Sequence, residues 1–165
     1  MKTSVGFRAA VLAVAAGSLL AVPFAMPASA AQSASCKTVT TALKGGKITA
    51  AFTKCSPAAL AAGGSASFTN PPKGTTKGTL KLTLTWKGGK GTTVALVNFK
   101  NNPAGIGKCP KGQTRELVTG TVKSGTGAAA KTIKVGEKVT SSTCAVTTGA
   151  KLGSSTLEPG TAFKL

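Results

Sequence analysis

The four cysteines constrain the fold of this chain more than any other feature. Four cysteines allow three disulfide connectivities, but the sequence between the first two favours one of them. Gly45 and Gly46 are typical of a two-residue hairpin turn, because glycine readily adopts the positive φ angles that such turns require. Cys36 and Cys55 each stand nine residues from this turn, so they face each other at a separation that a disulfide can span. By elimination, Cys109 pairs with Cys144.

The same register places Val39 opposite Phe52 and Leu43 opposite Ile48 on one face of the predicted hairpin. Aromatic residues are few in this chain, so its interior must be built largely from aliphatic side chains. A thin core of this kind needs covalent support. We expect each disulfide to stabilise the fold by about 3 to 4 kcal/mol.

The first thirty residues have the pattern of a secretory signal peptide. Lys2 and Arg8 supply a positive region, residues 9–22 form an apolar run, and residues 28–30 (ASA) form a small-residue cleavage site. The apolar run is shorter than a membrane-spanning helix requires, and no second run follows. We therefore expect residues 1–30 to be a signal peptide and residues 31–165 to be a single domain without a transmembrane segment, secreted and extracellular or loosely associated with the cell envelope.

Alternating apolar and polar residues, many of them β-branched, dominate the mature chain, with glycines about every ten residues. We therefore predict an all-β fold: a disulfide-stapled, immunoglobulin-like antiparallel β-sandwich or a partly closed barrel. The one helical pattern lies at residues 56–63, with Ser56 as cap, Pro57 at the first helical position and Gly63 as stop. The expected strands cover residues 37–44, 47–54, 65–69, 79–87, 91–99, 115–123, 131–139, 143–148 and 160–165.

The single tryptophan, Trp86, ends one of these alternating strands. It shares a strand face with the leucines at positions 80, 82 and 84, so we expect it in the core. The register of the 79–99 hairpin stays open, because turns of two or three residues both pair the leucines with apolar partners. Lysines on the other face and in the turn are candidate polyanion contacts: Lys81, Lys87 and Lys90.

Several segments of the mature chain form a pattern: an early cysteine hairpin, residues 85–92 (TWKGGKGT), residues 120–125 (GTVKSG), Cys144, and a closing strand that ends in Phe163 and Leu165. This pattern resembles small secreted actinobacterial two-disulfide β-sandwich proteins of unknown function. That family has no assigned activity, so the resemblance implies a fold more than a function. The chain is also similar in architecture to the neocarzinostatin-like apoproteins, which hold a small molecule, although its basic charge and long disulfide loops differ from theirs.

The composition argues against catalysis. The mature chain has no histidine, aspartate or tyrosine, which removes the usual activated nucleophiles and catalytic triads. Its three acidic side chains, Glu116, Glu137 and Glu158, are expected to be solvated partners of nearby lysines. They are too scattered for a calcium site, and zinc would need histidines or closely spaced cysteine pairs. We expect no enzymatic activity, no cofactor and no bound metal.

The net charge is the most unusual property of the mature chain. Without Lys2 and Arg8, 19 of the 21 basic residues remain against three glutamates, which gives +16. Lysines in such numbers keep a protein soluble and also favour nonspecific attraction to polyanions. We therefore expect a cationic β protein, monomeric, that binds anionic envelope polymers or lipid headgroups nonspecifically and reads no nucleic-acid sequence. The alternative is a small-molecule carrier or an inhibitor of a secreted hydrolase that presents residues 100–113.

Overall fold

The computed structural model describes residues 33–72, 74–102, 107–148 and 151–165. The predicted signal peptide lies outside these residues. Among the described residues, none of the helices has the length and apolar character needed to cross a membrane. The strands and short helices, in chain order, are β1 (Ser35–Lys44), β2 (Lys47–Ser56), η1 (Ala58–Leu60), β3 (Gly64–Thr69), β4 (Lys77–Trp86), β5 (Gly91–Asn102), β6 (Thr114–Gly125), α1 (Ala129–Thr132), β7 (Lys138–Thr148), β8 (Lys151–Leu157) and β9 (Phe163–Lys164).

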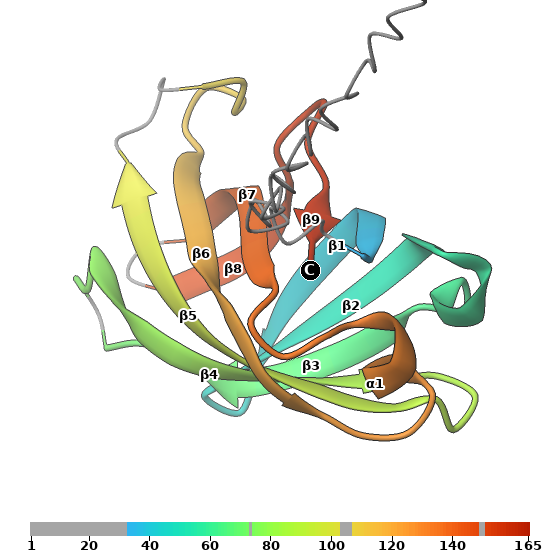
Figure 1. Ribbon diagram of the computed structural model, residues 1–165. Helices are drawn as coiled ribbons and strands as arrows, with labels where there is room; N and C mark the ends of the chain where they lie inside the picture. Colours follow the sequence, from blue (N-terminus) through green and yellow to red (C-terminus); the bar gives the residue numbers. More distant parts are fainter. Residues whose placement is uncertain (1–32, 73, 103–106, 149–150) are drawn as a thin grey trace, which may run out of the picture.

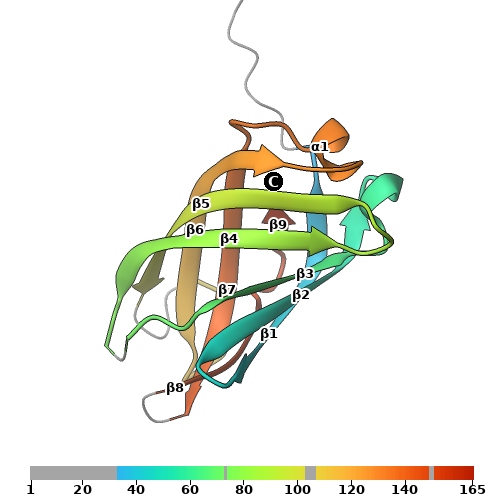
Figure 2. The ribbon, with the colours of Figure 1, turned by 90° about the horizontal axis from the view of Figure 1, so that it is seen from below.

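The strands close into an antiparallel barrel (Figures 1 and 2). Each of the first seven strands pairs with the next one in sequence, and β1 also pairs with β8, which joins the two edges of the sheet. The short β9 pairs with the beginning of β1 and with β7. The predicted all-β, disulfide-stapled antiparallel fold is confirmed. Of its two expected forms, the structure has the barrel, and the barrel is fully closed.

The hairpin of β1 and β2 forms as the sequence predicted. Gly45 and Gly46 have φ angles of 57° and 76°, and Lys44 pairs with Lys47 across them, so the loop has two residues. Cys36 faces Cys55 and is bonded to it, and the second disulfide joins Cys109 to Cys144. The predicted pairs Val39 with Phe52 and Leu43 with Ile48 are also present.

The two ends of the barrel differ. Helices η1 and α1 and the β4–β5 turn lie at one end, on the right in Figure 1, and we call this the closed end. The β3–β4 loop lies at the other end, on the left, and the Asn70 backbone N–H donates a hydrogen bond to the Gly46 carbonyl of the β1–β2 turn; we call this the open end. Figure 2 shows the same separation, with α1 at one end of the barrel and the β3–β4 connection at the other.

Tight packing fills the closed end. Trp86 is only 2% exposed, and its indole Nε1 donates a hydrogen bond to Thr93 Oγ1 at 2.9 Å, which satisfies the one polar atom of the buried ring. Leu60 from η1, Ile133 after α1 and Leu165 beside β9 are buried in the same core cluster. The prediction that Trp86 belongs to the core is confirmed.

The register of the β4–β5 hairpin is now defined. Trp86 pairs with Gly91 and Leu84 with Thr93, so the loop between the strands has four residues, 87–90, rather than the two or three considered from the sequence. Leu82 faces Ala95 and Leu80 faces Val97. The leucine face of β4 therefore meets small and β-branched side chains on β5.

Two sequence predictions of secondary structure are wrong. Residues 131–139 were expected to form one strand, but α1 and a turn occupy most of this segment, because Gly136 has a φ of 90° and Ile133 turns inward to cap the core. The strand β8 was missed, since its sequence KLGSSTL has too few apolar residues to alternate. The short helical turn predicted within residues 56–63 is present as a 3-10 turn, but Pro57 occupies the cap position without a side-chain hydrogen bond, and the Ser56 hydroxyl contacts Ser35 instead.

The disulfides should contribute strongly to stability, because the barrel core is small. We expect the double variant C36A/C55A to lose about 3 kcal/mol of unfolding free energy, since its bridge closes a loop between residues 19 positions apart. The matched variant C109A/C144A, whose cysteines are 35 positions apart, should lose slightly more. Denaturant unfolding monitored by Trp86 fluorescence measures both. Losses below about 1 kcal/mol in both variants would contradict this role.

Candidate functional site

A recess enters the barrel from its open end. Its outer part has a volume of about 140 Å³, and an inner part of about 60 Å³ lies deeper between the strands. The two parts adjoin, because they share the lining residues Thr41, Phe68, Leu80, Glu116 and Ser155. The closed end is filled by packed side chains, so this recess is where the barrel interior is left hollow. An eight-stranded barrel has an interior wide enough for one small ligand.

A row of three polar side chains crosses the wall of this recess. Asn101 on β5 faces Glu116 on β6, and Glu116 faces Thr143 on β7. Directly opposed residues in antiparallel strands have Cα atoms about 4.5 to 5.5 Å apart, so the three side chains are close neighbours. Asn101 lines the outer part, Thr143 the inner part, and Glu116 both. We call Asn101, Glu116 and Thr143 the polar row.

The polar row lacks internal hydrogen-bond partners. Asn101 Oδ1 and Thr143 Oγ1 are buried and have no partner in the described part of the chain, and Thr143 is only 6% exposed. Glu116 is partly buried, and this burial raises the pKa of its carboxyl group above the ordinary value of 4.5. Within residues 33–72, 74–102, 107–148 and 151–165, the one ion pair joins Arg115 to Glu158, so no cation there neutralises Glu116.

The remaining wall of the recess is mainly apolar. Ile48, Phe68, Leu80 and Phe99 line the outer part. Phe99 faces Gly78 across β4 and β5. A Cβ at position 78 would lie only 2.8 Å from Cε1 of the Phe99 ring. Glycine at this position therefore lets the phenylalanine ring pack closely against β4 at the mouth of the barrel. Thr41 and Ser155 add polar atoms, but they bond each other at 2.8 Å.

A second buried carboxylate, Glu158, lies apart from the recess, where the β5–β6 loop meets β7. Glu158 is 3% exposed and accepts hydrogen bonds from the Lys108 backbone N–H, the Ser142 hydroxyl and Arg115 Nε. These bonds, with that of Lys108 first, lower the pKa of its carboxyl group from 4.5 to about 2. Gly107 has a φ of 82°, and a Cβ there would lie 2.3 Å from Glu158 Oε1. This cluster fixes the β5–β6 loop and serves structure.

The expectation that the three glutamates are solvated partners of lysines is wrong. Glu158 pairs with Arg115, the one arginine within residues 31–165. Glu137 is 6% exposed and accepts a hydrogen bond from the Ser33 hydroxyl. Glu116 lies in the recess. No local sequence pattern indicates this burial, because a glutamate among polar and β-branched residues is compatible with either face of a strand.

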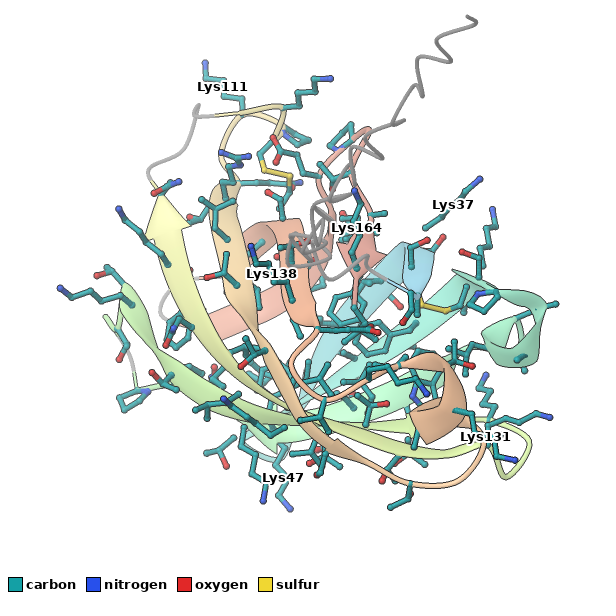
Figure 3. The ribbon with its side chains drawn as sticks, viewed as in Figure 1. Lys37, Lys47, Lys111, Lys131, Lys138 and Lys164 are labelled. Carbon is teal, nitrogen blue, oxygen red and sulfur yellow. A yellow bond between two sulfur atoms is a disulfide. The ribbon has the colours of Figure 1, made fainter. Side chains whose placement is uncertain are left out.

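The lysines are dispersed over the exterior. Every lysine whose side chain the structure describes is exposed, and Figure 3 shows Lys37, Lys47, Lys111, Lys131, Lys138 and Lys164 on different sides of the barrel. Of the candidate polyanion contacts, Lys87 and Lys90 share the β4–β5 turn, whereas Lys81 lies within β4, about 17 Å of strand before that turn. The structure therefore brings Lys87 and Lys90 together but leaves Lys81 apart from them.

Comparison of the chain with known protein families, with curated proteins and with solved structures gives no match. The resemblance to small secreted actinobacterial proteins and the likeness to neocarzinostatin-like apoproteins therefore stay predictions. The absence of enzymatic activity also stays a prediction. The interpretation of the recess rests on its geometry.

The Glu158 cluster predicts a specific dependence of stability on pH. Because the folded-state pKa of Glu158 lies below its ordinary value, its stabilising effect is fully present above about pH 4.5 and is lost as the pH falls toward about 2. E158Q should therefore lose about 3 kcal/mol of unfolding free energy at pH 7, and the difference from the wild type should shrink below pH 4.5. Denaturant unfolding at several pH values measures this.

E116Q is the matched control, since burial shifts the pKa of Glu116 in the opposite direction. The ionised Glu116 carboxylate is disfavoured in the folded protein, so E116Q should not destabilise the protein at pH 7. A constant difference between E158Q and the wild type from pH 7 to 2 would contradict the role given to Glu158.

Proposed function

We propose that the protein is a secreted, non-enzymatic binding protein that holds one small molecule in the recess at the open end of its barrel. The observation that carries this proposal is the polar row, in which Asn101 Oδ1 and Thr143 Oγ1 are buried without a partner in the described chain. The function corresponds to the carrier alternative considered from the sequence.

The energetic argument is that these groups are costly unless something binds them. A buried polar group without a hydrogen bond costs about 1 to 3 kcal/mol. If the residues at positions 101 and 143 served only to fill the barrel, apolar side chains like those at the closed end would be favoured there. Their presence beside an apolar wall that includes Phe68 and Leu80 is typical of ligand sites, in which a few polar groups orient a mainly apolar molecule.

Export is part of the proposal. The two disulfides are compatible with an extracellular location, and residues 1–30 have the pattern of a signal peptide. Outside the cell, a barrel with two covalent bridges can carry or sequester a small molecule without further protein. The inhibitor alternative has less support, because Lys108 and Cys109 in the 100–113 segment are bonded to Glu158 and Cys144 of the barrel.

Nonspecific adhesion to anionic polymers or lipid headgroups is a second candidate function. It is favoured by the exposed lysines on several sides of the barrel (Figure 3). The dispersed arrangement supports diffuse attraction rather than a defined binding face. Adhesion of this kind would keep a carrier near the cell envelope, so the two functions are compatible.

Binding in the recess should occur even for a neutral probe of suitable size. We expect benzyl alcohol to shift the NMR signals of recess residues such as Leu80 and Phe99, with little change between about 50 and 500 mM salt. L80W should abolish these shifts by filling the recess. L96W is the matched control, since Leu96 is 46% exposed on the exterior. Shifts that persist in L80W would contradict binding in the recess, and the absence of shifts in the wild type both for benzyl alcohol and for charged probes of the same shape would contradict the proposed function.

Adhesion to polyanions should depend on the number of lysines and not on their positions. We expect the triple variant K81Q/K87Q/K90Q and the triple variant K37Q/K111Q/K131Q to elute equally early from a polyphosphate resin, both before the wild type. Retention of the wild type should fall steeply with salt. Retention of the wild type that is equal at low and high salt would rule out electrostatic adhesion. Reduced retention of K81Q/K87Q/K90Q alone would show that the binding site is localised.

A further inference from the structure

The polar row offers oxygen acceptors from three side chains, and a negative charge, to the recess. Glu116 contributes a carboxylate, Asn101 contributes the unpaired Oδ1 and Thr143 the unpaired Oγ1. The register of β5, β6 and β7 holds these groups side by side on one wall. A protonated primary amine has three N–H donors and no acceptor, so it can donate one hydrogen bond to each member of the polar row.

The charges around the recess favour a cation. No lysine or arginine is among the described residues that line either part of the recess. Arg115, the sequence neighbour of Glu116, is bound to Glu158 and Ser142 in the cluster outside the recess. The carboxylate therefore lacks a counter-ion among the described residues, and hydrogen bonds between an ammonium group and a carboxylate are about twice as strong as those between neutral groups.

The volume and the walls define the rest of the ligand. A cavity of about 150 Å³ is known to hold a benzene molecule, and the outer recess has about 140 Å³. Phe68, Leu80 and Phe99 surround this space, and the inner recess extends it toward Phe52 and Phe163. These dimensions suit one ring or a short hydrocarbon chain and exclude larger molecules unless they project from the open end.

We propose that the ligand of this recess is a small organic ammonium ion: a primary amine on a compact apolar body, with Glu116 as its counter-ion and Asn101 and Thr143 as acceptors. This inference rests on the proposed function, because it requires that the recess is a ligand site. It assigns the polar row to recognition of the amine and the surrounding apolar residues to recognition of its hydrocarbon part.

The test compares three probes of the same shape: benzylammonium, benzyl alcohol and benzoate. Calorimetric and NMR titrations of the disulfide-bonded 31–165 protein at pH 7 should give a Kd for benzylammonium about tenfold or more below that for benzyl alcohol, because the neutral probe has one donor and no charge. Benzoate should not bind measurably, because its carboxylate would face Glu116.

Variants assign the selectivity to the polar row. E116Q should weaken benzylammonium binding by about tenfold and leave benzyl alcohol within about twofold, and T143V should weaken benzylammonium by a few fold. E137Q removes a carboxylate remote from the recess and should change neither Kd. If E116Q does not fold, the three-probe comparison on the wild type and T143V still decides the question.

The outcomes separate this inference from the proposed function. Equal binding of amine and alcohol, or amine binding that is insensitive to E116Q, would overturn the ammonium inference while the recess remains a ligand site. Tighter binding of benzoate would overturn it in the same way. Failure of all three probes to bind in the recess would overturn both the inference and the proposed function.

Discussion

The closure of the barrel through β1 is the constraint on which the rest of the structure depends. This strand pairs with β2 along its whole length, and on its other side with β8 and β9. The disulfide between Cys36 and Cys55 fixes the β1–β2 pair at the end where β9 also joins. Closure removes the free sheet edges that would otherwise invite association. It also creates an interior in which polar side chains are withdrawn from water.

That interior is divided into a packed half and a hollow half. At the closed end, η1, α1 and the C-terminal Leu165 cover the Trp86 cluster, whose one polar ring atom is satisfied by Thr93. At the open end, the polar row is partly withdrawn from water with acceptors that the described chain leaves unused. Two glutamates therefore have opposite environments. The Glu158 carboxylate accepts several hydrogen bonds, whereas Glu116 has no hydrogen-bond donor among the described residues. A saturated carboxylate serves structure, whereas an unsatisfied one inside a recess is suited to a ligand.

Local signals allowed much of the fold to be predicted, because the β1–β2 turn, the alternating leucines before Trp86 and the cysteine spacing each act over a few residues. Global closure could not be predicted in the same way, since it depends on the pairing of β1 with β8, and Lys151–Leu157 carries no apolar alternation. The site was missed for a related reason. Asn101, Glu116 and Thr143 are distant in sequence and become neighbours only through the registers of β5, β6 and β7. Once it is known which residues of β6 point into the barrel, Glu116 can be recognised from the sequence as a charged residue at an inward position.

The central claim is that Glu116 lies in a hollow, water-poor interior that an ammonium ion can enter. A pH titration of the Glu116 carboxyl carbon by NMR, without and with saturating benzylammonium, tests this claim most directly. We expect a pKa above the ordinary 4.5 in the free protein, because burial disfavours the charge, and a lower pKa in the complex, because a cation stabilises it. An ordinary pKa that is the same in both states would show that the carboxylate is exposed to water and would contradict the account.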